Sequence, residues 1–118
     1  MIADPRRLAA ALLFAGVLSY SSTLPAQNAK TAAESLFQAG KQLMADKKYA
    51  DACPKLAESQ KLDPSPGTLL NLGRCYEALG KTASAWTEYK AAAVLAAQLG
   101  QKDREQGARD LAKELEPK

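Results

Sequence analysis

A pattern of large and small residues that occurs twice, 33 positions apart, constrains this chain more than any other feature. The first copy is Leu36, Ala39, Gly40, Leu43, Ala52 and Leu56, and the second is Leu69, Leu72, Gly73, Tyr76, Ala85 and Tyr89. Antiparallel helices pack closely only where small residues let their axes approach, and large residues fill the space beside such contacts. We therefore expect each copy to fold as a helical hairpin, with Gly40 against Ala52 and Gly73 against Ala85.

The composition favours helices throughout. Of the 118 residues, 47% are hydrophobic and only 6% are aromatic, and most of the apolar residues are Leu and Ala. Leu and Ala have high helix propensity, whereas β-branched and aromatic residues are enriched in strands. A chain of this length holds one hydrophobic core rather than two. The prediction is one small all-α domain.

Capping residues indicate where the first two helices begin and end. Thr31 and Glu34 have the spacing of a capping box, which predicts a first helix from there to about Ala45. Asp46 is the candidate N-cap of a second helix that ends near Leu62.

Prolines and glycines mark the later boundaries. Ser65 is the candidate N-cap of a third helix, and Pro66 is its expected first residue. Gly80 and Thr82 separate the third helix from the fourth, and Gly100 ends the fourth.

A last helix is expected over residues 101–116, because apolar residues recur there at helical spacing on one face. These residues are Ala108, Leu111, Ala112 and Leu115. The helix would cover the exposed face of the second hairpin as a capping helix. The alternative is that it is the first half of a third hairpin whose remainder is missing.

The N-terminus has the order of a secretory signal: Arg6 and Arg7, an uncharged apolar run over 8–19, and small residues that lead to Ala26. The 12 residues of that run would form a helix of about 18 Å, short of a hydrocarbon core of about 30 Å. We expect cleavage after Ala26 or after Ala29, no membrane span thereafter, and a periplasmic or secreted protein. The alternatives are an uncleaved anchor and a buried helix. The expected domains are a signal peptide over 1–26, a short linker over 27–30 and a helical domain over 31–118.

Several classes of function are disfavoured by what the sequence lacks. Histidine is absent, which excludes a histidine-based triad, a histidine general base and histidine metal ligands. There is no phosphate-binding loop and no nucleophile elbow. The 16 Lys and Arg and the 13 Asp and Glu are interspersed, so the net charge of +3 does not indicate a nucleic-acid partner. We expect no enzymatic activity, no cofactor and no metal.

Each copy of the pattern resembles a tetratricopeptide repeat (TPR), a helical hairpin with large apolar, small, aromatic and Ala positions at these spacings. The second copy matches best, because Asn71, Leu72 and Gly73 stand together and Gly80 lies at the turn between its helices. The resemblance covers about residues 31–97. It implies antiparallel helical hairpins stacked as a short TPR solenoid. Repeat one would cover about 31–64, repeat two about 65–98 and the capping helix about 101–116.

In the TPR family the first helix of each hairpin lines a concave groove that holds a peptide. Carried over to this chain, the resemblance places in the groove Phe37, Lys41 and Met44 from the first hairpin and Leu70, Asn71 and Arg74 from the second. The three apolar residues would anchor a peptide, while Lys41 and Arg74 would form a short basic row suited to an acidic segment or a C-terminal carboxylate. Of the residues that hold such a carboxylate in the best-known members, Asn71 is the one present here. The alternative is that Lys41 and Arg74 are ordinary solvated charges.

Cys53 and Cys75 are the only cysteines. They fall in the expected second and third helices, which are neighbours in such a stack, and an exported protein meets an oxidising environment. A disulfide fits these positions, and closing its loop would stabilise the fold by about 3 kcal/mol. Two separate buried hydrophobes, a reactive thiol and half of a metal site remain as alternatives.

The sequence therefore predicts a non-catalytic adaptor of the cell envelope that binds a protein or peptide partner, with an acidic segment favoured, in a TPR groove. The alternative is a structural or oligomerising helical module, including a shortened N-terminal part of a larger envelope protein. Self-association belongs to this alternative, because stacked repeats usually need about three units for stability.

Overall fold

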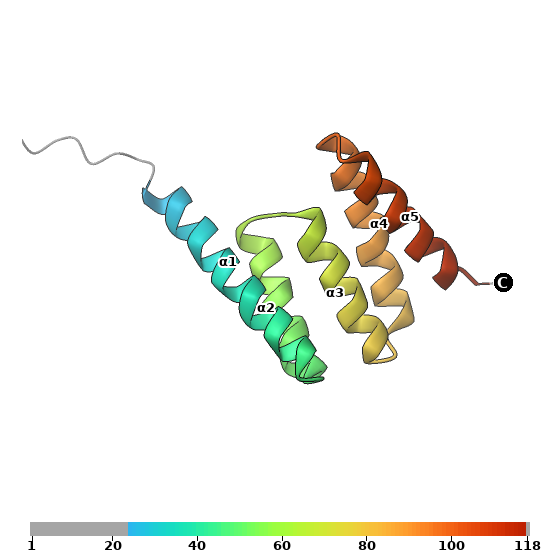
Figure 1. Cartoon of the computed structure of the whole chain (residues 1–118), viewed down its shortest axis with the longest axis horizontal. Helices are drawn as coiled ribbons and strands as arrows, with labels where there is room; N and C mark the ends of the chain where they lie inside the picture. The colour runs from blue at the N-terminus through green and yellow to red at the C-terminus, as the bar shows by residue number, and fades with distance from the viewer. Residues whose placement is uncertain (1–23, 118) are drawn as a thin grey trace, which may run out of the picture.

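A computed structural model describes residues 24–117 of the protein, which form five helices and no strand (Figure 1). The helices are α1 (Leu24–Ala45), α2 (Tyr49–Leu62), α3 (Pro66–Ala78), α4 (Thr82–Gln98) and α5 (Lys102–Leu115). The all-α class that the composition predicts is confirmed for this part of the chain.

The helices form a single row, because each one packs mainly against the next one in the chain (Figure 1). α1 touches α3 only slightly, and the two are joined mainly through α2, which lies against both. At the other end of the row α5 packs along α4 and buries Ala108 and Ala112. The apolar side of the last helix therefore faces α4.

Three of the four turns between helices are built in the same way. After the helix, one residue adopts a left-handed backbone, with φ of 60° at Lys47, 73° at Gly80 and 69° at Gly100. The N–H of the following residue then donates to a carbonyl of the helix just ended, over 2.8 Å in each turn. These bonds satisfy carbonyl groups that a helix end leaves without partners. Glycine adopts this conformation without a steric penalty, which is why Gly80 and Gly100 predicted their turns and Lys47 did not.

The connection between α2 and α3 is different: it contains Pro64, and Pro66 follows it directly. Ser65 is the N-cap residue of α3 and Pro66 is the first residue of the helix, as predicted. The Ser65 side chain makes no capping hydrogen bond; instead its backbone N–H donates to the side-chain oxygen of Gln60 over 3.0 Å. Gln60 thus ties the end of α2 to the start of α3.

Two predicted helix starts are wrong. The first helix begins at Leu24 rather than Thr31, so Thr31 and Glu34 lie inside α1 and form no capping box. Residues 27–30, the expected linker, are helical for the same reason. The second helix has Lys48 rather than Asp46 at its N-cap, because Lys47 is still part of the turn. Most of the predicted signal peptide, residues 1–23, lies outside the described residues.

The two glycines of the repeated pattern lie at close helix crossings, as predicted, but the residues opposite them differ from the prediction. A Cβ at Gly40 would lie 2.7 Å from Cγ of Leu56, and one at Gly73 would lie 2.6 Å from Cδ1 of Tyr89. Leu56 and Tyr89 are equivalent positions of the two copies and are both fully buried. The expected partner Ala52 meets Gly40 only through its carbonyl oxygen, 3.5 Å from that Cβ position. The crossings therefore pair a small residue with a large one.

The core of the first three helices contains a disulfide bond between Cys53 of α2 and Cys75 of α3, whose Cα atoms are 5.7 Å apart. Both residues are buried, together with Leu56 and Leu72. Of the alternatives that the sequence leaves open, the structure shows the bonded pair. α1 is fastened to the same core by Ser59, whose hydroxyl donates to the Ala33 carbonyl over 2.7 Å.

The glycine crossing predicts opposite effects for two identical substitutions. Gly73→Ala should lower the free energy of unfolding by about 1–3 kcal/mol, because the added methyl group displaces the Tyr89 ring. Gly107→Ala, inside α5 where a Cβ meets nothing within 4 Å, should raise it by about 0.5–1 kcal/mol through helix propensity. Urea denaturation followed by circular dichroism measures both changes. Equal effects at the two sites would contradict the crossing.

The disulfide predicts a redox-dependent stability. Its cysteines are 22 positions apart, and opening a loop of this size should cost about 3 kcal/mol and lower the melting temperature by roughly 10 °C or more. Calorimetry with and without a reductant measures the shift, and thiol counting on the denatured protein verifies the redox state. The Cys53→Ala/Cys75→Ala variant is the control and should be insensitive to the reductant. A fully reduced wild type that melts at the oxidised temperature would refute this account.

Candidate functional site

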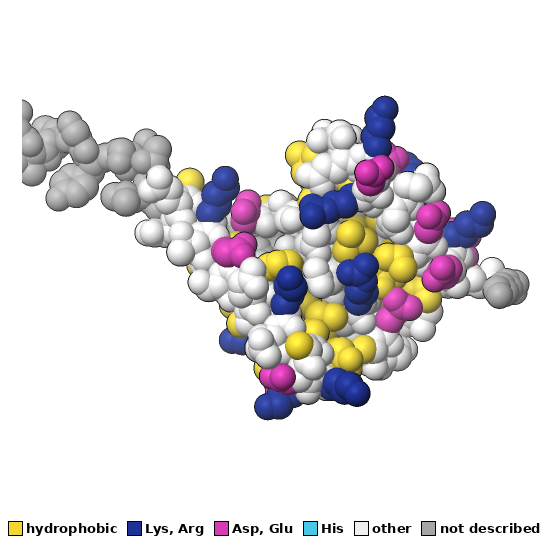
Figure 2. Space-filling view, viewed as in Figure 1, with side chains coloured by type: hydrophobic (Ala, Val, Ile, Leu, Met, Phe, Trp, Pro, Cys, Tyr) yellow, Lys and Arg dark blue, Asp and Glu magenta, His cyan; other side chains and the backbone are white. Residues whose placement is uncertain are grey.

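The residues predicted to line a groove lie on α1 and α3, two helices that come near each other without packing closely. Phe37 and Met44 of α1 are half-buried against the core cluster that holds the disulfide. Lys41 of α1 and Arg74 of α3 are exposed. Figure 2 shows apolar side chains on this face between α1 and α3 with basic side chains across them, and side chains of both charges along α1 and α5. The arrangement is an apolar floor with basic groups above it.

Lys41 is held in place by the aromatic floor. Its Nζ lies 5.3 Å from the centroid of the Phe37 ring, a cation–π distance. At an exposed site such a contact is worth about 0.5–1 kcal/mol and leaves the ammonium group hydrated. The charge of Lys41 therefore remains available to an anionic group above Phe37.

The two other predicted residues on α3 are engaged within the protein. The Asn71 side-chain nitrogen donates to the Gly67 carbonyl of its own helix over 2.9 Å, which leaves its side-chain oxygen for another partner. Leu70 packs against the clusters that α3 forms with α4 and α5, beside Ala92 and Tyr89. Leu70 thus lies on the α5 side of α3, away from Phe37 and Met44, which belong to the first cluster.

Arg74 stands beside a polar cluster that the sequence does not reveal. The buried Tyr89 of α4 donates its hydroxyl hydrogen to the carboxylate of Glu77 on α3. Burial raises the pKa of the Tyr89 phenol, and the hydrogen bond and the charge of Glu77 raise it further. The charge of Glu114 on α5 acts in the same direction, whereas that of Arg74 lowers the pKa.

The only sequence signal for this cluster is the spacing of apolar residues in the last helix. Leu111 and Leu115 define the packed side of α5, and Glu114 falls on its flank. Glu114 lies on the flank nearest Tyr89 because of the way α5 packs on α4. The spacing of apolar residues alone does not specify this packing.

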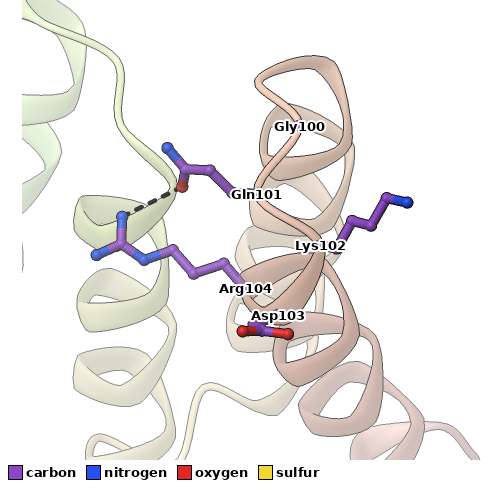
Figure 3. Close-up of a pocket in the computed structure, with 5 residues that line it drawn as sticks. All are labelled: Gly100, Gln101, Lys102, Asp103 and Arg104. Carbon is purple, nitrogen blue, oxygen red and sulfur yellow. Dashed lines mark hydrogen bonds between the residues drawn. The ribbon is translucent and has the colours of Figure 1, made fainter.

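Two hollows adjoin this face. A small cavity of about 150 Å³ lies between α1 and the α2–α3 connection, and it is lined by Ala33, Glu34, Phe37, Ser59, Asp63, Ser65 and Thr68. A wider open hollow of about 600 Å³ lies at the turn before α5, lined by residues 100–104. There Arg104 and Gln101 extend toward the first turn of α3 and are joined by a 3.3 Å hydrogen bond (Figure 3). In the smaller hollow the Ser59 hydroxyl donates to the Ala33 carbonyl.

No cluster of three or more potential metal ligands occurs within residues 24–117. In the same part of the chain no helix has both the length and the apolar character needed to cross a membrane.

Comparison with known proteins found no match: neither a protein-family model, nor a curated protein, nor a solved structure corresponds to this chain.

The Tyr89–Glu77 bond predicts a specific loss of stability at alkaline pH. An unfolded tyrosine ionises near pH 10, whereas the raised pKa of Tyr89 keeps its phenol protonated in the folded protein. The unfolded state is therefore favoured as pH rises above about 10, by about 1.4 kcal/mol per pH unit. The stability advantage of wild type over Tyr89→Phe should shrink by about 1 kcal/mol between pH 10 and pH 11, because the unfolded phenol is already half ionised at pH 10. Urea denaturation of both proteins measures the change, and a constant difference would contradict the hydrogen bond of Tyr89 to Glu77.

Proposed function

We propose that this chain is a non-catalytic adaptor that binds an acidic peptide segment of another protein across α1 and α3. The observation that carries the proposal is the pair Lys41 and Arg74, which are exposed at equivalent positions of α1 and α3, together with the half-buried Phe37 and Met44 of α1. Apolar side chains of a peptide can pack on this floor while its carboxylates meet the two cations.

We further propose that the chain belongs to the TPR family, with α1 and α2 as repeat one, α3 and α4 as repeat two, and α5 as the capping helix. Support comes from the equivalent crossings Gly40–Leu56 and Gly73–Tyr89, which repeat at the same 33-residue spacing as the rest of the pattern. In this assignment α1 and α3 are the groove-lining helices, which agrees with the exposure of Lys41 and Arg74.

We propose a periplasmic or secreted location for the adaptor. The disulfide between Cys53 and Cys75 supports it, because structural disulfides persist in oxidising compartments and are rare in the cytosol. The charged, apolar and small-residue order of residues 6–26 supports it independently.

The test is a peptide screen followed by titration of the selected peptides. We expect a displayed peptide library to yield acidic sequences with apolar residues, and Lys41→Glu/Arg74→Glu to weaken their binding about tenfold, because each reversal replaces attraction by repulsion. Fluorescence anisotropy measures the affinities.

The matched control is Lys55→Glu/Lys61→Glu, which makes the same change in net charge at two exposed positions of α2. This control should bind like wild type. Equal weakening by both double variants would show that only the overall charge matters, and the proposed surface would then be wrong.

A further inference from the structure

The two ends of the helix row differ in chemical character. The outer side of α1, opposite the buried Ala33 and Gly40, is polar and exposed along its length. It carries Asn28, Thr31, Ser35, Gln38 and Gln42. Two of these make hydrogen bonds along the helix, from Gln38 to Glu34 at 2.7 Å and from Gln42 to Asp46 at 3.4 Å. This end of the row needs no further covering.

At the opposite end, a groove of about 310 Å³ runs between α4 and α5. Its floor is apolar and consists of Ala93, Val94 and Ala112. Val94 is 57% exposed, the largest exposure among the large hydrophobic residues of the described chain. Small side chains on both helices would let a third helix approach their axes closely, as Gly73 does for α4.

The rim of this groove is mainly basic. Lys90, Arg109 and Lys113 line it together with one acidic residue, Glu116. Arg109 is paired with Glu105 at 3.1 Å, and Lys90 lies 4.2 Å from the centroid of the Trp86 ring. Within residues 24–117 no ion pair joins Lys113 to another side chain. The charge of Lys113 therefore remains available to an acidic partner. The charge of Lys90 remains available as well, because contact with the Trp86 ring does not neutralise it.

A second copy of this chain fits the groove poorly. If two such grooves met each other, the same three cations would face each other across the interface, which is unfavourable. If α1 of a second copy entered the groove, its polar outer side would leave Val94 without apolar contacts. The occupant must therefore combine an apolar stripe with acidic flanks.

We propose that the groove between α4 and α5 is a second docking site, which binds an amphipathic helix with acidic flanks from another protein. The apolar stripe of that helix would cover Val94 and Ala112, and its carboxylates would face Lys90 and Lys113. This is the helix-in-groove mode of recognition. The site is separate from the surface on α1 and α3 and does not depend on the function proposed for it.

The test uses two synthetic helical peptides with the same leucine stripe, one with glutamate and one with lysine at the flanking positions. The oxidised full chain should bind the acidic peptide and not the basic one. Its amide NMR shifts should change along α4 and α5, and these changes should persist in the Lys41→Glu/Arg74→Glu variant, which separates this site from the first. Shifts confined to α1 and α3 would overturn the proposal.

Variants test the basic rim and the apolar floor of the groove separately. Lys90→Glu/Lys113→Glu should weaken binding of the acidic peptide about tenfold. Val94→Asp should also weaken this binding, because it places a charge in the apolar floor of the groove. Lys55→Glu/Lys61→Glu is again the matched control and should have no effect, and circular dichroism verifies that every variant is folded. Equal binding of the acidic and the basic peptide would refute the proposal. Self-association of the chain in sedimentation, if Val94→Asp abolished it, would also refute the proposal and would show that a second copy occupies the groove. Binding to anionic vesicles that depends on the same lysines, without binding of the acidic peptide, would assign the groove to a lipid surface instead.

Discussion

The close approach of α3 and α4 at Gly73 sets the position of more of the other residues and helices than any other contact. The Tyr89 ring lies directly over the glycine, so that a Cβ there would be 2.6 Å from Cδ1, and the tyrosine is fully buried. The same placement brings the tyrosine hydroxyl to the carboxylate of Glu77. Because α5 packs on α4 and not along α3, its position depends on this crossing as well.

The charges that a partner would meet follow from this arrangement. Glu77 is bound to Tyr89, whereas Arg74, one helical turn earlier, stays exposed and adjoins the open space beside α1. Lys41 reaches the same space from α1 and lies over Phe37. Since α1 and α3 touch only slightly, their separation is set through α2, which the Cys53–Cys75 bond fastens to α3. The disulfide thus contributes to the separation of α1 and α3, the helices that carry the two basic residues.

Much of the fold could be predicted because its signals are local. Gly80, Gly100 and Pro66 are placed by backbone preferences that operate within one turn of chain, and all three lie where the sequence indicates. The prediction failed where two local signals competed. Asp46 is a good N-cap residue, but Lys47 adopts the left-handed turn that Gly80 makes 33 positions later. Thr31 resembles a cap, but the seven residues before it in α1 are also helical.

The candidate site was predictable in part. Periodicity alone indicates that Lys41 and Arg74 are exposed, because each falls on the polar side of its helix. Leu70 was assigned to the same surface but packs toward α4 and α5, and Asn71 bonds to its own helix. The Tyr89–Glu77 pair and the flank on which Glu114 lies depend on how α4 and α5 rotate against α3. No spacing within one helix carries that information.

What the sequence determined by itself is the helical class, the number of helices and the two glycine crossings, since propensity and small-residue spacing act along the chain. Only the tertiary structure decided what stands opposite each glycine, whether Cys53 and Cys75 are bonded, and which charges share a face. These features depend on contacts between residues far apart in sequence, such as the 5.7 Å that separates the Cα atoms of the two cysteines. Such distances are set by the rotation and crossing of whole helices, and these are fixed only when all the helices pack together.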